Sequence, residues 1–461
     1  MTRLIHHLFL AILLGLAHIA AAADTRPNLV LFLADDLSAA DTSVYGNREI
    51  PTPNMASLAR DGLVFDAAYV ASPSCAPSRA ALLSGRYGLR NGSTFNHQAL
   101  ADNVKKWPAY FKELGYEVVA IGKVAHYGQV TSYGFDYAGF FKYHEDICIE
   151  KAVEWLAARR SNKPLCLLVG TNWPHVPWPR EARLSPDTLT IPPKLADTPE
   201  TRIARAAYST AVMNADRDLG MVREAAKKHL SANTVFVFSA DHGTQFPFRK
   251  WNLYEGGLRV PLIVAWPKHV AAGRRTSAMV SWIDFLPTLL QIAGADPAMA
   301  APDIDGRSFA GVLSGKTETH RDRIFGTHSG DGNMNFYPAR SVRIGNWKYI
   351  RNLDSSLEFH SHVDLAPKDT AYWPSWVREA PHNPVIADLV QRYLHRPSEE
   401  LYNLETDPDE LHNLAGEGTH AAQMKMLRAA LDEWMRSLDD QGMPTEYAHK
   451  PVPKRGNSKA N

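Results

Sequence analysis

The chain contains several short apolar runs, each of a length typical of a buried β-strand. Asn28–Ala34 is the clearest, and it stops at the paired acids Asp35 and Asp36. A run that is apolar on both faces is expected of a strand inside a parallel sheet that is covered on both sides. Runs of the same character occupy residues 117–122, 165–170, 234–239 and 262–266.

Segments with the apolar spacing of helices lie between these runs, at residues 54–61, 78–83, 107–114, 147–159 and 204–229. Strands that alternate with helices predict an α/β sandwich with a large, mostly parallel sheet. Ligands of such sheets bind beyond the carboxyl ends of the strands. Most of the runs lead directly into polar residues, namely Asp35 and Asp36, Lys123, His175, and Asp241 with His242.

The pattern changes after about residue 330. Residues 340–351 alternate around a turn at Gly345 and Asn346, which predicts an antiparallel hairpin, and residues 421–438 have the spacing of an amphipathic helix. We therefore expect a large domain at residues 24–335 and a smaller α+β C-terminal domain with an antiparallel sheet at residues 336–450. The polar tail at residues 451–461 is expected to be disordered.

The first 23 residues have the features of a cleaved signal peptide. Arg3 precedes an apolar run at residues 8–19, and small residues end at Ala23. The run is short for a membrane span, although an uncleaved anchor is the alternative. We expect a protein that is exported, periplasmic or secreted, after cleavage near Ala23. No later run reaches the length of a membrane-spanning helix, so no membrane association is expected of the mature form.

Composition narrows the class of protein. The 461 residues carry a formal net charge of +1, with 45% hydrophobic and 21% charged residues. These values are ordinary for a globular protein that buries a large core. A nucleic-acid-binding protein would show a strongly basic footprint, so none is expected as a partner.

Export makes the three cysteines informative, because exported proteins usually pair them. Cys148 begins a predicted helix and Cys166 begins the strand that follows it. That helix would be roughly 18 Å long, which is too far for a disulfide. We expect both to be buried thiols, and this leaves Cys75 alone.

Cys75 lies in a polar loop at the edge of a predicted helix, with Arg79 one turn along on the same face. A helix N-terminus and an arginine both favour an anion at this position. A structural cysteine and a thiol nucleophile of the Cys-His type are the alternatives that the residues by themselves leave open.

The sequence from Cys75 to Arg86 reads CAPSRAALLSGR. It resembles the C-x-P-S-R…L-x-G-R signature of the type I sulfatases at every fixed position. The resemblance implies an alkaline-phosphatase-like sandwich and sulfuric ester hydrolysis. It also implies that Cys75 is oxidised to formylglycine by a separate enzyme, either a formylglycine-generating or an anaerobic sulfatase-maturating enzyme.

Two acidic clusters follow two of the predicted strands. Carboxylate oxygens of Asp35, Asp36 and Asp241 suit a hard cation such as Ca²⁺, although paired acids at a strand end more often form a cap or a solvated turn. The resemblance implies one Ca²⁺ per site. The fourth ligand in the family is commonly Asn, and His242 stands at that position here.

The remaining candidates are weak signals by themselves, because a histidine or lysine in a loop is usually a packed or surface residue. The resemblance implies that Lys123 holds sulfate and the nucleophile, and that His126 contacts the formylglycine hydroxyl. It further implies that His175 contacts sulfate and the leaving group, and that Lys250 binds the sulfate bridge.

The resemblance extends from about residue 27 to 434, and it leaves the substrate open. Residues 241–254 and 347–353 are similar to the sulfamidase branch, which acts on N-sulfoglucosamine of heparan at chain ends. Residues 122–126 and 174–177 are similar to iduronate-2-sulfatases, so a polysaccharide O-sulfatase, including one for algal polysaccharides, is the alternative. Residues that could line a sugar subsite are His328, Asp331, Arg340 and His360.

Two other classes of protein fit parts of the pattern. A phosphohydrolase or phosphonate hydrolase of the alkaline phosphatase superfamily could share the sheet and the metal site. A glycan-binding protein without catalysis is disfavoured because every catalytic position is filled.

Overall fold

The computed structural model describes residues 26–141, 147–296, 303–332, 334–366 and 371–451. The predicted signal peptide lies outside the described residues, and so does the predicted tail apart from residue 451. In the part of the chain that is described, no helix has both the length and the apolar character that crossing a bilayer requires.

A large sheet of eight strands forms the centre of the molecule, in the order β5-β4-β6-β1-β7-β8-β2-β9. Its four central strands coincide closely with predicted apolar runs: β4 Glu117–Gly122, β6 Leu165–Gly170, β1 Asn28–Ala34 and β7 Thr234–Ala240. All four are parallel to their neighbours in this group, and their side chains are almost wholly buried. The predicted α/β class and mostly parallel sheet are confirmed.

One predicted strand runs in the opposite direction. The run at residues 262–266 forms β8, Leu262–Ala265, which pairs antiparallel with β7 and with β2, Leu63–Phe65. The expectation that it shares the character of the central parallel strands is therefore wrong in its direction. The carboxyl end of β8 therefore lies at the opposite end of the sheet from those of the parallel strands, which explains why no candidate site residues follow it.

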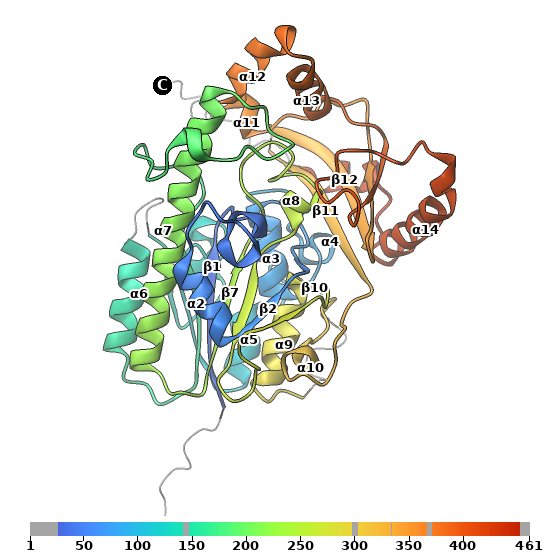
Figure 1. Ribbon diagram of the computed structural model, residues 1–461. Coiled ribbons are helices and arrows are strands. Elements are labelled where there is room, and N and C mark those ends of the chain that lie inside the picture. The colour runs from blue at the N-terminus through green and yellow to red at the C-terminus, as the bar shows by residue number, and fades with distance from the viewer. Residues whose placement is uncertain (1–25, 142–146, 297–302, 333, 367–370, 452–461) are drawn as a thin grey trace, which may run out of the picture.

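The sheet is completed by β5, Tyr137–Gly139, at one edge and β9, Arg274–Thr276, at the other. Helices cover both faces (Figure 1). One group consists of α2 Pro53–Asp61, α6 Ile147–Ala158 and α7 Pro199–His229, and the other of α3 Cys75–Ser84, α5 Trp107–Glu113 and α9 Phe285–Ile292.

Helix α7 begins at Pro199, five residues before the predicted start, and its local sequence explains the difference. The Thr198 side chain accepts a hydrogen bond from the backbone N–H of Thr201, and Pro199 occupies the first turn. A threonine cap followed by proline is a common helix start that apolar spacing does not reveal.

A second, smaller sheet lies beside the large one and is antiparallel throughout, in the order β11-β12-β13-β14 (Figure 1). Its strands are β11 Arg323–Asp331, β12 Asn335–Ile344, β13 Trp347–Asn352 and β14 Glu399–Asn403. The predicted hairpin turns at Gly345, whose φ of 55° suits glycine, and the predicted helix is α14, Ala421–Ser437, which packs on β12 and β13.

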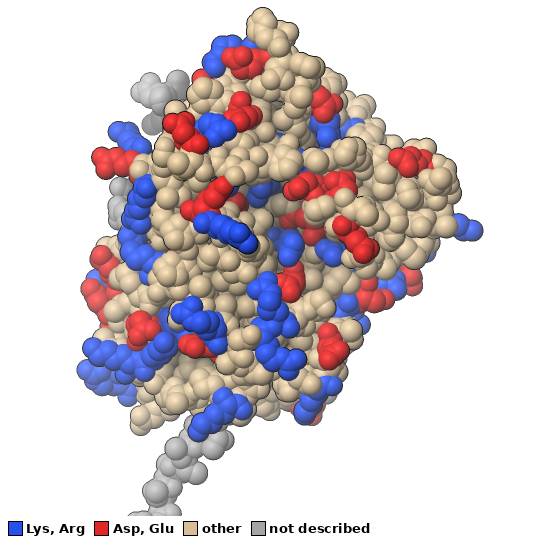
Figure 2. All heavy atoms as spheres, in the orientation of Figure 1, with Lys and Arg blue, Asp and Glu red and all other residues tan. Residues whose placement is uncertain are grey.

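The other α-helices of the described residues are α4 Gly88–Asn91, α8 Glu255–Leu258, α10 Ala310–Leu313, α11 His362–Leu365, α12 Trp373–Glu379, α13 Pro384–Leu394 and α15 Met443–His449. Two short strands, β3 Ala68–Tyr69 and β10 Val280–Ser281, pair with each other. None of the three cysteines forms a disulfide, and Cys148 and Cys166 are buried, as predicted; Cys75 is buried as well. Lys and Arg side chains are interspersed with Asp and Glu over the face in Figure 2, and neither sign covers a continuous area of it.

Candidate active site

The carboxyl ends of the neighbouring parallel strands β4, β6, β1 and β7 lie side by side at one end of the large sheet. Because these strands are parallel and adjacent, the polar residues that follow them are brought together. Asp35 and Asp36 follow β1, Lys123 follows β4, and Asp241 and His242 follow β7. His175 comes from the loop after β6. The sequence places these residues in separate loops, and the sheet collects them.

Five buried side chains at these strand ends could together hold a metal ion. Asp35, Asp36, Cys75, Asp241 and His242 each offer a ligand atom, and these atoms all lie within 4.8 Å of one another. The backbone at Asp36 adopts a left-handed conformation with φ of 66°, and its N–H donates to Oδ1 of Asp241 at 3.0 Å. The predicted ligand positions thus form one compact cluster of oxygen and nitrogen donors.

The His242 ring is oriented so that one nitrogen is available to the cluster. Its Nδ1 lies 2.9 Å from the carbonyl oxygen of Gly243, so in the neutral ring the proton resides on Nδ1. Its Nε2 lies 3.4 Å from Asp36 Oδ1 and 3.5 Å from Asp241 Oδ2. Burial lowers the pKa of His242, but Asp241 and the Cys75 thiolate raise it to about 9. This negative potential favours a bound cation.

Cys75 occupies the first position of α3, and its side chain is buried among these groups. Its Sγ lies 3.2 Å from His242 Nε2 and 3.9 Å from both Asp35 Oδ1 and Lys123 Nζ. Burial raises the pKa of the Cys75 thiol, but Lys123, Lys250 and His242 together lower it well below its usual range. The position therefore stabilises an anion, as the sequence predicts.

Three buried cationic side chains offset the three carboxylates. Arg79 reaches Asp241 through Nε at 3.0 Å and Asp35 through Nη2 at 3.4 Å. Lys123 bonds to Asp35, and Lys250 Nζ lies 2.9 and 2.8 Å from the two oxygens of Asp36. Addition of a divalent cation would leave the site positive, which suits an anionic substrate and an ionised nucleophile.

Two further histidines lie beside the cluster. His175 Nδ1 contacts the carbonyl oxygen of Val176 at 2.6 Å, and its Nε2 lies 3.9 Å from Asp36 Oδ2. His126 is 3% exposed, and its Nε2 lies 2.8 Å from His97 Nδ1. Burial lowers the pKa of His126 to about 4 and that of His175 to about 3. Both rings are therefore neutral at pH 7.

Sequence reasoning did not identify His97, which contacts His126, or His362. Asp331 joins them: its Oδ1 is 3.0 Å from His97 Nε2 and its Oδ2 is 2.9 Å from His362 Nε2. His362 stacks on Trp251, with ring centroids 4.9 Å apart. His97 follows no strand and belongs to no motif, so the sequence carries no signal for it.

Three of the residues predicted for a sugar subsite lie on the paired strands β11 and β12, but they differ in their surroundings. Asp331 contacts His97, whereas Arg340 is fully buried and pairs with Asp440 and Glu446 at 2.6 Å each. His328 is 2% exposed, and His360 Nδ1 contacts Asp364 at 2.6 Å. The expectation that Arg340 lines an open subsite is wrong, because the guanidinium holds α15 and the preceding loop against β12.

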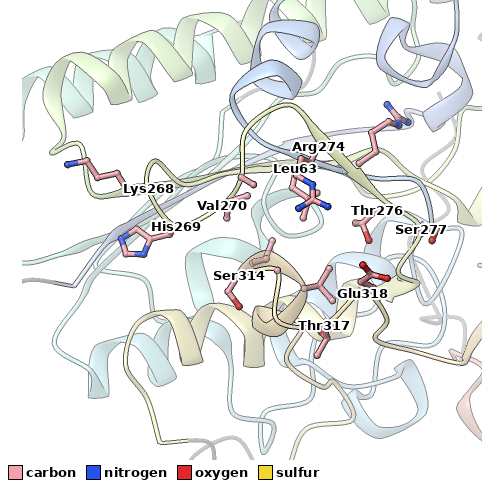
Figure 3. A pocket seen from close by; sticks show the side chains of 15 residues that line it. Leu63, Lys268, His269, Val270, Arg274, Thr276, Ser277, Ser314, Thr317 and Glu318 are labelled. Carbon is pink, nitrogen blue, oxygen red and sulfur yellow. The ribbon is translucent and has the colours of Figure 1, made fainter.

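A cavity of about 750 Å³ lies elsewhere, at the β9 edge of the large sheet (Figure 3). It is lined by β9, the segment before it and the segment after α10, including Lys268, Arg274 and Glu318. None of the predicted catalytic or metal-ligating residues lines it. The chemical groups described above are therefore gathered at the carboxyl ends of β4, β6, β1 and β7 and not in this cavity.

Two family profiles match the chain. One described as Sulfatase matches residues 27–295, which is more than half of the sequence. One described as N-sulphoglucosamine sulphohydrolase, C-terminal, matches residues 242–394. The chain is 29% identical to an ulvan-active sulfatase of Formosa agariphila, over 91% of this chain and 82% of that protein. It is also 29% identical to the human N-sulphoglucosamine sulphohydrolase, over 90% of this chain and 91% of that protein.

Solved structures share the fold. A structure in complex with its substrate D-glucosamine-2-N,6-O-disulfate superposes with a TM-score of 0.68 at 21% identity, covering 92% of this chain and 100% of the other. A phosphonate monoester hydrolase of Agrobacterium radiobacter also superposes with a TM-score of 0.68, at 18% identity, covering 91% of this chain and 96% of the other. At such low identity these likenesses establish the architecture alone.

Proposed function

The chain belongs to the sulfatase family, and we propose that it hydrolyses sulfate esters or sulfamates on a sulfated glycan. The observation that carries this proposal is the position of Cys75. Its side chain lies at the start of α3, inside a cluster of metal-ligand atoms and beside Lys123. A reactive group at this point meets the positive charge that an anionic substrate requires.

We propose that Cys75 is converted to formylglycine by a maturation enzyme of the host before the protein is active. Hydrated formylglycine would supply one hydroxyl to attack sulfur and a second from which a proton is lost to release sulfate. The thiol in the structure occupies the position of that side chain. Its contacts with His242, Asp35 and Lys123 therefore indicate which groups would surround the hydroxyls.

Asp35, Asp36, Asp241 and His242 would hold one Ca²⁺. The donor set fits this ion, since three carboxylates and one imidazole nitrogen converge without exposure to solvent. When bound, Ca²⁺ would favour ionisation of the nucleophile and neutralise a sulfate oxygen.

The protein side chains would divide the remaining work. Lys123 and Lys250 would offset the charge of the sulfuryl group, while Arg79 orients Asp35 and Asp241. Lys250 would protonate the leaving group, or His175 would do so once the anionic substrate has raised its pKa and its Nε2 has taken up a proton. His126 would accept the proton from the second hydroxyl.

For the substrate we propose terminal N-sulfoglucosamine of heparan, removed by exo action. The matching C-terminal profile and the identity to the human sulphohydrolase support this choice. The equal identity to an ulvan-active sulfatase supports a polysaccharide O-sulfatase as the second candidate. We further propose that the protein is exported, and that its catalytic and C-terminal domains divide before β11 and not at the predicted residue 335, because β11 pairs with β12 in the small sheet.

The test has two stages. The mass of the peptide that contains residue 75, after expression with a maturation enzyme, should match the aldehyde and not the thiol. The matured protein is then assayed on N-sulfoglucosamine, ulvan oligosaccharides, an aryl sulfate and an aryl phosphate. Release of sulfate from the sulfamate supports the first candidate, and release from ulvan alone supports the second. Faster turnover of the phosphate than of every sulfate would overturn the proposal in favour of a phosphohydrolase.

Cys75→Ala should abolish sulfate release, because no other group in the cluster can become the aldehyde. Cys148→Ala is the matched control, since Cys148 is a buried thiol on α6 that forms no disulfide. Full hydrolysis by the Cys75→Ala variant would contradict the mechanism.

A further inference from the structure

A chain of two hydrogen bonds links the buried His126 to the buried Asp331 through His97. His126 Nε2 lies 2.8 Å from His97 Nδ1, and His97 Nε2 lies 3.0 Å from Asp331 Oδ1. His126 is buried and the Asp331 side chain is 5% exposed, whereas the His97 side chain is 53% exposed. The middle ring is thus the one in contact with solvent.

Asp331 is held in place from several sides. Its Oδ2 accepts from His362 at 2.9 Å and from Asn96 Nδ2 at 3.3 Å. The Asn96 amide oxygen in turn accepts from the backbone N–H of Ala76 at 3.0 Å, which ties the carboxylate to the residue next to Cys75. Burial raises the pKa of Asp331, but hydrogen bonds from His362 and His97 hold it well below its usual range. Asp331 is therefore an ionised acceptor.

The carboxylate of Asp331 determines which nitrogen carries the proton in the rings of His97 and His126. A carboxylate requires that His97 Nε2 carries a proton, so in neutral His97 the Nδ1 is an acceptor. His126 Nε2 must then donate to it, which leaves His126 Nδ1 without a proton. Among the described residues His126 Nδ1 has no hydrogen-bond partner, and the ring interacts with the Cys75 side chain.

We propose that Asp331 and His97 are positioning residues that keep His126 Nδ1 unprotonated and directed at residue 75. The inference rests on the proposed function, in which His126 accepts a proton there. When Nδ1 accepts that proton, Nε2 passes its own proton to His97 Nδ1, and Asp331 stays ionised beside the new positive charge. Two consecutive hydrogen bonds thus connect the carboxylate of Asp331 to the buried base His126.

The same geometry makes activity sensitive to the charge of His97. A protonated His97 would donate from Nδ1 to His126 Nε2, and His126 Nδ1 would then carry the proton and cease to be a base. Besides Asp331 and His126, the His97 ring faces Tyr127, and the two ring centroids lie 6.1 Å apart. The charges of Cys75 and Lys123 also act on the His97 ring. The hydrogen bond with Asp331 raises the pKa of His97 above 6.5 against the effect of burial. Turnover should therefore fall as the pH is lowered through the pKa of His97, which lies higher than that of an ordinary histidine.

The experiment compares Asp331→Asn, His97→Ala and His97→Gln with the wild type and with His412→Gln, an exposed histidine far from this chain of contacts. All are produced with the maturation enzyme, and formylglycine content is checked by mass. Nitrogen NMR of histidine-labelled protein reads the His126 tautomer directly, with assignment by loss of the signals in His126→Gln. The pH profile of kcat is measured on one sulfate ester.

We expect wild-type His126 to carry its proton on Nε2. Asp331→Asn should lower kcat by about 10- to 100-fold with little change in KM, and move the acid limb to lower pH. The glutamine amide can still accept from His126 Nε2, so His97→Gln should retain more activity than His97→Ala and lose the acid limb that His97 sets.

A wild-type proton on His126 Nδ1, or an Asp331→Asn variant with unchanged kcat and pH profile, would overturn the inference. The proposed function fails separately, if matured wild-type protein releases no sulfate from any substrate. The tautomer measurement still decides the inference in that case, because it does not depend on turnover.

Discussion

The Nε of Arg79 lies 3.0 Å from Oδ2 of Asp241, and neither side chain has any exposure to solvent. A second nitrogen of the same guanidinium lies 3.4 Å from Asp35. Arg79 thus connects α3, which carries Cys75, to the ends of β7 and β1. The planar, forked donor geometry of arginine allows one side chain to hold both carboxylates.

Replacement of Arg79 should therefore disturb folding and activity together. Arg79→Met removes a charged partner from each of two buried carboxylates, Asp35 and Asp241, which costs about 3 to 5 kcal/mol of unfolding free energy. Arg79→Lys keeps the charge but lacks the fork, so it should also lose sulfate release. Thermal denaturation and turnover measure the two effects. Arg378→Lys, at an exposed ion pair with Glu200, is the control and should change neither. An Arg79→Lys variant with wild-type activity would contradict this account.

Removal of the proposed Ca²⁺ with a chelator should lower the melting temperature, and added Ca²⁺ should restore it. A ligand that binds only the folded state stabilises it by about 2.7 kcal/mol at about 100 times its dissociation constant. Asp36→Asn should weaken this response, because Asp36 supplies one of the converging carboxylates. Asp388→Asn, at an exposed position on α13, should respond to Ca²⁺ as the wild type does. A melting temperature that ignores both chelator and Ca²⁺ would argue against a metal at this cluster.

His175 and Lys250 are distinguished by the leaving group. Loss of a general acid costs about 100-fold or more when the leaving group is a poor one, such as a sugar hydroxyl, and little when it is an activated phenol. We expect this selective loss in His175→Gln, measured as kcat on a sugar sulfate and on 4-nitrophenyl sulfate. An equal loss on both substrates would indicate that His175 binds sulfate only. In that case Lys250→Met should show the selective loss.

Stability at acid pH should depend on Asp284, which lies far from the proposed chemistry. This fully buried carboxylate receives Arg321 Nε at 2.6 Å and the backbone N–H groups of Ser281 and Arg307. Burial raises the pKa of Asp284, but Arg321 lowers it to about 2 from the ordinary 3.8. A depressed pKa means that the charged group stabilises the fold above about pH 4, and that this contribution is lost as the pH falls toward 2.

The Asp284→Asn variant should therefore be less stable than the wild type at neutral pH by about 3 to 5 kcal/mol. The difference should narrow by about 2 kcal/mol between pH 4 and pH 2, as Asp284 of the wild type takes up its proton. Urea denaturation across this range measures it. Asp388→Asn should show a small difference that does not vary with pH. A constant gap for Asp284→Asn would contradict the assignment.

Much of the fold could be read from the sequence because its signals are local. The central strands are continuous apolar runs, and the hairpin at Gly345 combines alternation with a turn residue. The direction of β8 could not be read, since an apolar run looks the same whichever way it pairs. The start of α7 was missed because it depends on a cap at Thr198 and not on apolar spacing.

The sequence by itself determined the family, the central strands and the identity of the residues that follow them. The reason is that the family motif is one continuous segment, and each group of polar residues directly follows its own apolar run. Only the tertiary structure decided that Arg340 is a buried structural cation and that Asp331 stands behind His97. Asn96 and Asp331 are separated by 235 positions yet form a hydrogen bond. Such a contact depends on how the small antiparallel sheet packs against the large one, and packing of distant elements leaves no periodic trace in either segment.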